Sequence, residues 1–125
     1  MKKLVLECWF LLLRFEWIMR FCGFKELRRT VEDEPVRQGL SARPAEQDHL
    51  CRAMDYACVF YFKPVLCLQR SAATTLLLRH HGWGAEMVIG AQVRPFRSHA
   101  WCEINGAVVN DKPYVRDIYE ALERC

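Results

Sequence analysis

The first half of the chain carries apolar residues at helical intervals. Residues 3–21 are predicted to form one helix, because charged side chains interrupt its apolar run at roughly helical spacing. Residues 24–31 fit a short second helix. A further helix is predicted over about 44–62. The apolar positions that form one face of that helix are Leu50, Met54, Ala57 and Tyr61.

Proline and glycine mark the ends of these helices. The stretch from Glu32 to Pro44 is predicted to be a loop, and Ser41 within it is a candidate cap for the helix that follows. Lys63-Pro64 ends that helix, because the residue before a proline disfavours helical geometry. The next helix is expected to begin at about Cys67 and to stop near Gly82.

Beyond Gly84 the pattern changes from helices to strands. Residues 85–93 are short, apolar and partly β-branched, and residues 98–104 and 107–111 flank the turn dipeptide Asn105-Gly106. Residues 116–124 are predicted to form a short closing helix. Helices followed by antiparallel strands predict an α+β fold, with N-terminal helices packed on one face of a small antiparallel sheet.

Length and composition favour one globular domain. With 125 residues and 52% hydrophobic residues, residues 1–125 are expected to form a single unit, helical over 1–62 and catalytic over 63–125. The net charge is only +3, with 18 basic residues scattered among 15 acidic ones, so a nucleic-acid partner is not expected. The seven cysteines form no CxxC pair, so a structural metal site is not expected. A cofactor is not expected either.

The N-terminal segment opens like a signal peptide, with two lysines before an apolar run. The charged residues Glu7, Arg14, Glu16 and Arg20 interrupt the run, which is too short to span a bilayer. An amphipathic helix docked on the domain is the favoured interpretation, and stable membrane insertion is not expected. The cysteines are therefore expected to be reduced thiols in the cytoplasm.

Three residues could carry out nucleophilic catalysis. Cys67 lies at a predicted helix start, where free N–H groups and the helix dipole favour a thiolate. His99 begins an apolar strand and is a candidate general base, and Asp111 follows the neighbouring strand and could orient it. His80 and His81 lie at a helix end, where they could cap carbonyls or interact with the dipole.

The register of the predicted hairpin decides whether Asp111 can reach His99. A two-residue turn pairs Ile104 with Ala107 and places His99 and Asp111 on opposite faces of the sheet. A three-residue loop, or an equivalent bulge, places them opposite each other on one face. Asn110 is the alternative orienter, because it lies on the other face from Asp111.

The segment from Cys67 to Asp111 resembles the transglutaminase-like leader peptidases of lasso-peptide biosynthesis. The matching positions, in chain order, are Cys67-Leu68-Gln69-Arg70-Ser71, Leu77-Leu78-Arg79 with Gly82, Val88-Ile89-Gly90, His99-Ala100-Trp101-Cys102-Glu103 and Asn110-Asp111. The resemblance implies a transglutaminase-like, papain-like fold with Cys67 as nucleophile, His99 as base and Asp111 as orienter. It suggests no role for Arg70 beyond an ion pair with an acidic residue.

The resemblance also implies a reaction and partners. Such enzymes cut the leader from a ribosomally made precursor peptide, and a separate lasso cyclase then acts on the freed core. Some members carry a winged-helix recognition domain in front, but residues 1–66 are too short and too helical for one. A separate winged-helix leader-recognition protein is therefore the expected partner. Trp9, Phe10 and Trp17 could dock it, although burial in the core is the favoured interpretation.

Two alternative functions remain open at this point. The same thioester could be transferred to an amine, which would make the protein a transglutaminase-like acyltransferase. The other alternative is a non-catalytic module of the same fold that binds a peptide. An intact set of Cys67, His99 and Asp111 argues against it, because a binding module has no need of all three.

Overall fold

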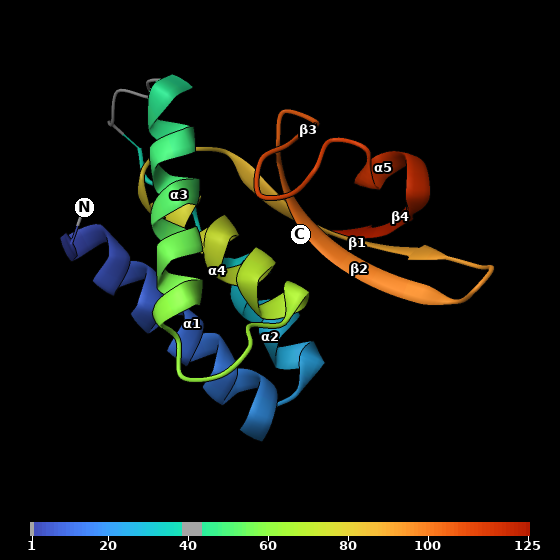
Figure 1. The fold of residues 1–125 in the computed structure, drawn as a ribbon, viewed down its shortest axis with the longest axis horizontal. Helices are drawn as coiled ribbons and strands as arrows, with labels where there is room; N and C mark the ends of the chain where they lie inside the picture. The colour runs from blue at the N-terminus through green and yellow to red at the C-terminus, as the bar shows by residue number, and fades with distance from the viewer. Residues whose placement is uncertain (1, 39–43) are drawn as a thin grey trace.

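The computed structural model describes residues 2–38 and 44–125 (Figure 1). Its elements, in chain order, are α1 (Lys2–Phe21), α2 (Phe24–Asp33), α3 (Pro44–Phe60), α4 (Cys67–His80), β1 (Ala85–Gln92), β2 (Arg97–Ile104), β3 (Ala107–Val108), α5 (Val115–Ile118) and β4 (Glu120–Arg124). The predicted helices over 3–21, 24–31 and 44–62 are confirmed. The suggested cap Ser41 lies outside the described residues.

Helix α4 is the centre of the fold. It contacts α1, α2 and α3 on one side and strands β1 and β2 on the other, so that the helices and the sheet form separate layers (Figure 1). Nearly every residue from Gln69 to Arg79 is buried. The helix ends at His80, and Gly82, two residues later, has a φ of 91°, the left-handed geometry that glycine adopts without strain.

The sheet is antiparallel, with the strand order β3-β2-β1-β4. One face packs on α4 through Met87, Cys102 and Ile104. The other face carries a smaller apolar cluster in which Val88 and Trp101 meet Val115 of α5. The α+β class, with helices on one face of a small sheet, is therefore as predicted.

The predicted closing helix over 116–124 is wrong. Only Val115–Ile118 is helical, and the chain then forms β4, which pairs with β1. A helix of nine residues has little stability of its own. An open edge of β1 instead offers the segment a ladder of backbone hydrogen bonds, and Cys125 closes it by exchanging two bonds with Met87. This long-range pairing overrides the local pattern.

Helix α1 docks on the domain as predicted, through Cys8, Leu11, Leu12 and Phe15. The favoured interpretation of Phe10 and Trp17 as core residues is wrong, since their exposed fractions are 59% and 64%. Helical periodicity identifies an apolar side but does not say what covers it. None of the helices in the described part of the chain has the length and apolar character needed to cross a membrane.

Candidate functional site

Cys67 is the first residue of α4 and is exposed. The residue before it, Leu66, has extended geometry, with φ −76° and ψ 150°, and provides no side-chain cap. The first N–H groups of the helix are therefore left without a side-chain acceptor, which favours negative charge at this end. The helix start predicted from Pro64 and the apolar pattern is confirmed.

The three residues from Gln69 to Ser71 tie this end of α4 to three other parts of the chain. Buried Gln69 donates from Nε2 to the backbone oxygen of Leu12 in α1 over 2.8 Å. Arg70 forms an ion pair with Asp55 of α3, which is the acidic partner that the sequence suggested. Ser71 accepts a hydrogen bond from the Asn110 amide over 3.3 Å. The first turn of α4 is thus held in place on several sides.

His99 and Asp111 form a close pair. His99 Nε2 lies 2.5 Å from Asp111 Oδ2, and both side chains are about three-quarters buried, with exposed fractions of 23% and 27%. A carboxylate can only accept a hydrogen bond, so His99 Nε2 carries a proton and donates a hydrogen bond to Asp111. His99 Nδ1 is then left free to accept a proton from another group.

The pair forms by a route that differs from the one expected. Asn105 and Gly106 have φ of 52° and 80°, and Ile104 pairs with Ala107, so the turn has two residues. The three-residue loop that would have placed His99 opposite Asp111 is therefore not formed. The ladder instead ends early, because the Asn110 side chain takes the Cys102 N–H over 2.7 Å. The chain leaves the sheet there, and Asp111 turns toward His99.

Asn110 is therefore not the orienter of His99 in this structure. Its oxygen is occupied by Cys102 and its amide by Ser71. The predicted strand over 107–111 is correspondingly short, with only Ala107–Val108 in the sheet.

One pocket brings the candidate residues together. It has a volume of about 180 Å³, and Cys67, His99 and Asp111 all line it. Its other walls include Arg70, Ser71 and Asn110. Within residues 2–38 and 44–125, no hydrogen bond involves the Cys67 thiol. Of the three candidate residues, His99 and Asp111 are therefore the pair joined by a hydrogen bond.

Aromatic rings form the wall behind His99. The His99 ring centre lies 5.2 Å from that of Tyr119 and 6.1 Å from that of Trp101. Buried Trp101 donates its indole N–H to Glu103 over 2.7 Å. Burial raises the pKa of Glu103, but the hydrogen bonds from Arg124 and Trp101 outweigh it, so the net pKa lies below the usual range.

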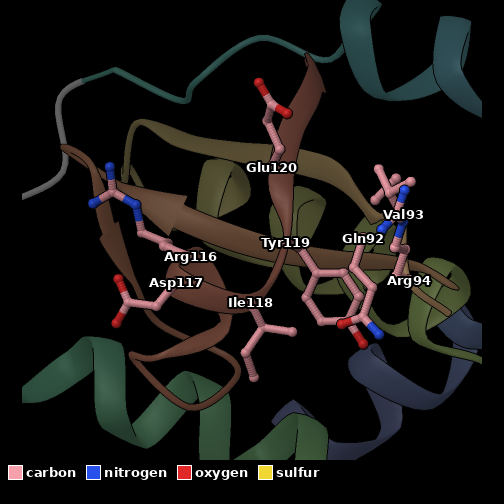
Figure 2. Close-up of a pocket in the computed structure, with 9 residues that line it drawn as sticks. Gln92, Val93, Arg94, Arg116, Asp117, Ile118, Tyr119 and Glu120 are labelled. Carbon is pink, nitrogen blue, oxygen red and sulfur yellow. The ribbon is translucent and has the colours of Figure 1, made fainter. Parts of the chain in front are cut away.

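A larger and more polar pocket lies beside this wall (Figure 2). It has a volume of about 520 Å³ and lies between the end of β1 with the residues after it and the segment from Arg116 to Glu120. Tyr119 lines this pocket, and its ring also lies against His99, which lines the smaller pocket. Arg94, Arg116, Asp117 and Glu120 give this pocket both signs of charge (Figure 2).

The remaining histidines and cysteines lie elsewhere. His80 and His81, at the end of α4, lie beside carboxylates, with His80 Nε2 2.5 Å from Glu34 and His81 Nε2 3.5 Å from Glu7. All seven cysteines are free. Burial raises the pKa of Cys8 and Cys102 to about 12, so these two are poor nucleophiles. In the described part of the chain, no group of three His, Cys, Asp or Glu could hold a metal ion.

Sequence reasoning missed two contributors to this site. Tyr119 fell inside the segment predicted as a helix, so nothing indicated that its ring would reach His99. The link from Asn110 to Ser71 joins residues 39 positions apart. Both residues belong to the quoted motifs, but no local signal shows that they touch.

Two comparisons with known proteins agree with this geometry. A family model described as the transglutaminase-like superfamily matches residues 9–124. Over 51 residues the chain is 43% identical to the microcin J25-processing protein McjB of Escherichia coli. That match covers 41% of this chain and 24% of the length of that protein. No solved structure matches the chain.

Proposed function

Because the chain belongs to the transglutaminase-like superfamily, we propose that it is a cysteine peptidase that removes the leader from a precursor peptide during lasso-peptide biosynthesis. The observation that carries the proposal is the pocket in which Cys67, at an uncapped helix start, lies with the hydrogen-bonded pair of His99 and Asp111. This combination supplies a nucleophile, a base and an orienting carboxylate.

In the proposed mechanism, His99 Nδ1 takes the proton of the Cys67 thiol. The thiolate attacks the carbonyl carbon of the scissile peptide bond and forms a tetrahedral intermediate. The backbone N–H of Cys67 is the natural donor to its oxyanion, because the first N–H groups of a helix have no partner within the helix. The intermediate collapses, the C–N bond breaks, and protonated His99 gives its proton to the leaving amine.

The second half of the reaction releases the leader. The thioester on Cys67 is attacked by water, whose proton passes to His99 Nδ1. The new tetrahedral intermediate expels the Cys67 thiolate, which regains its proton from His99. Throughout both halves, Asp111 holds the His99 ring by its Nε2 proton and stabilises the imidazolium that forms.

The choice of substrate rests on the similarity to a microcin J25-processing protein. The proposed partners are the leader of the precursor, a separate winged-helix recognition protein that presents it, and the lasso cyclase that receives the freed core. The proposed location is the cytoplasm, where a ribosomally made precursor is available and thiols stay reduced.

An acyltransferase is the second candidate, because it would use the same thioester. Hydrolysis leaves a free carboxylate at the end of the leader, whereas transfer leaves an amide with the accepting amine. The two reactions therefore differ by the mass of the leader product. A peptide-binding module without catalysis is disfavoured by the close pairing of His99 with Asp111, which binding alone does not need.

The test is a cleavage assay that uses the full chain, a precursor peptide and the recognition protein encoded beside them. The wild type is compared with Cys67→Ala and with the matched control Cys22→Ala, which removes another exposed thiol outside the pocket. Mass spectrometry is expected to detect leader fragments from the wild type and Cys22→Ala and none from Cys67→Ala. Equal cleavage by all three proteins would refute the proposal.

A further inference from the structure

We propose that Asn110 is a positioning residue that sets the separation between Cys67 and His99 by joining the hairpin to the nucleophile helix. The inference rests on the proposed cysteine chemistry. It concerns a contact between two parts of the site that lie far apart in the chain.

The Asn110 side chain accepts one hydrogen bond and donates another. Its Oδ1 accepts from the backbone N–H of Cys102 over 2.7 Å, and its Nδ2 donates to Ser71 Oγ over 3.3 Å. Both bonds are local to the site, since Cys102 lies in β2 with His99, and Ser71 lies one helical turn after Cys67. The amide is therefore a direct bridge between the strand of the base and the helix of the nucleophile.

The first of these bonds also ends the hairpin. Val109 N–H still donates to the Cys102 oxygen over 3.0 Å, as the two-residue turn requires. The reciprocal bond of an antiparallel pair would join Cys102 N–H to a backbone oxygen, but the Asn110 side chain takes that place. The backbone is released from the ladder at this point, and Asp111 can reach His99 although the register would direct it to the other face.

The second bond falls on a side chain that has little freedom to move. Ser71 is 1% exposed, and its backbone oxygen accepts from Thr75 Oγ1 over 2.8 Å. The residue is thus fixed within α4 in a packed environment. The bond from Asn110 to Ser71 therefore restrains the segment that carries Asp111.

Reaction rates are sensitive to a misplacement of about 1 Å, which can cost on the order of 100-fold. Loss of the bridge is therefore expected to reduce kcat by on the order of 10-fold to 100-fold, with little change in KM, because Asn110 acts on the reacting groups and not on the bulk of the peptide.

The experiment measures two properties of Asn110→Ala and Ser71→Ala. The first is kcat and KM for precursor cleavage with the recognition protein present. The second is the rate at which iodoacetamide alkylates Cys67 as a function of pH, read by peptide mass spectrometry. Thr74→Val is the matched control, since it removes a buried hydroxyl from the same helix that makes no hydrogen bond in the described part of the chain.

The proposal predicts lower kcat and an alkylation profile displaced to higher pH for Asn110→Ala and Ser71→Ala. The double variant should be no worse than Asn110→Ala alone, because both changes remove one bridge. Thr74→Val should keep the wild-type kcat and the wild-type alkylation profile. If Asn110→Ala fails to fold, Ser71→Ala carries the test, because it removes only a hydroxyl.

Two failures can be told apart. If the wild type and Cys67→Ala cleave equally, the proposed function fails whatever Asn110 does. If cleavage depends on Cys67 but both bridge variants keep wild-type kcat and the wild-type alkylation profile, the positioning role of Asn110 is overturned and the proposed function stands.

Discussion

Gly90 is the position at which a single methyl group should disturb the wall behind His99. It lies in β1 directly opposite His99. A Cβ built there would lie 2.6 Å from Cη2 of Trp101, 2.8 Å from its Cζ3 and 2.9 Å from the backbone oxygen of Glu120. The Trp101 ring is almost fully buried, and a hydrogen bond to Glu103 restrains its indole, so it has little room to move away.

Two opposing effects decide the sign for Gly90→Ala. Replacing glycine with alanine in a strand normally stabilises the fold by about 0.5–1 kcal/mol, because the unfolded chain loses freedom. Overpacking a well-filled region costs about 1–3 kcal/mol. Contacts this short, one of them with backbone, place the cost in the upper part of that range, so we expect a net loss of about 1–2 kcal/mol.

Urea unfolding monitored by tryptophan fluorescence measures this loss. For a domain of this size, the expected decrease in the midpoint is roughly 0.5–1 M. The matched control is Gly84→Ala, where a Cβ would meet nothing within 4 Å. The control is expected to be as stable as the wild type or slightly more so. A Gly90→Ala protein with the wild-type midpoint would refute the packing argument, since the methyl group would then have found space.

Three further predictions follow from the site. Asp111→Asn should lower kcat by up to about 10⁴-fold in the cleavage assay, because an amide can hold the wrong His99 tautomer; wild-type kcat would contradict the role of Asp111. Iodoacetamide at neutral pH should label exposed Cys67 and Cys22 well before Cys102, whose pKa burial raises to about 12, and equal labelling would contradict the burial. Buried Glu103 forms an ion pair with Arg124 over 2.9 Å, and Glu103→Gln should cost about 1–2 kcal/mol at pH 7 in urea unfolding, because the half-exposed Arg124 left behind can be hydrated. Because the folded pKa of Glu103 is lowered, this difference should shrink as pH falls below its ordinary value of 4.5, and a difference independent of pH would contradict a role for this ion pair.

Much of this fold could be predicted because its signals are local. The start of α4 follows from a proline break and the apolar run after it, and its end follows from Gly82. The hairpin follows from Asn105-Gly106, whose positive φ values are those of a tight two-residue turn. Each of these features depends on a few adjacent residues, so their chemistry is enough to identify them.

The errors depend on tertiary contacts that the local pattern of residues does not reveal. Residues 120–124 form a strand because β1 leaves an edge open, and no nearby residue indicates that edge. The hairpin ends early because the Asn110 side chain replaces a backbone acceptor, a choice that alternation of apolar residues does not reveal. Phe10 and Trp17 lie on an apolar side of α1 that the described residues leave exposed.

The candidate site depends both on local sequence signals and on tertiary contacts. The residue types of Cys67, His99 and Asp111 and their order along the chain indicated the chemistry. A plain two-residue turn directs His99 and Asp111 to opposite faces of the sheet, and the structure has that turn. His99 and Asp111 nevertheless lie 2.5 Å apart, because the hydrogen-bond ladder between β2 and the chain after β3 is interrupted. The interruption is the hydrogen bond from Cys102 N–H to the Asn110 side chain.

The most direct test of the central claim is to trap the acyl-enzyme. The full chain is mixed with precursor peptide and recognition protein, quenched in acid within the first turnover, and analysed by intact-mass spectrometry and peptide mapping. The account predicts a transient adduct with the mass of the leader less one water, attached to Cys67 and absent from Cys67→Ala. Cleavage without an adduct on Cys67, or with the adduct on another residue, would contradict it.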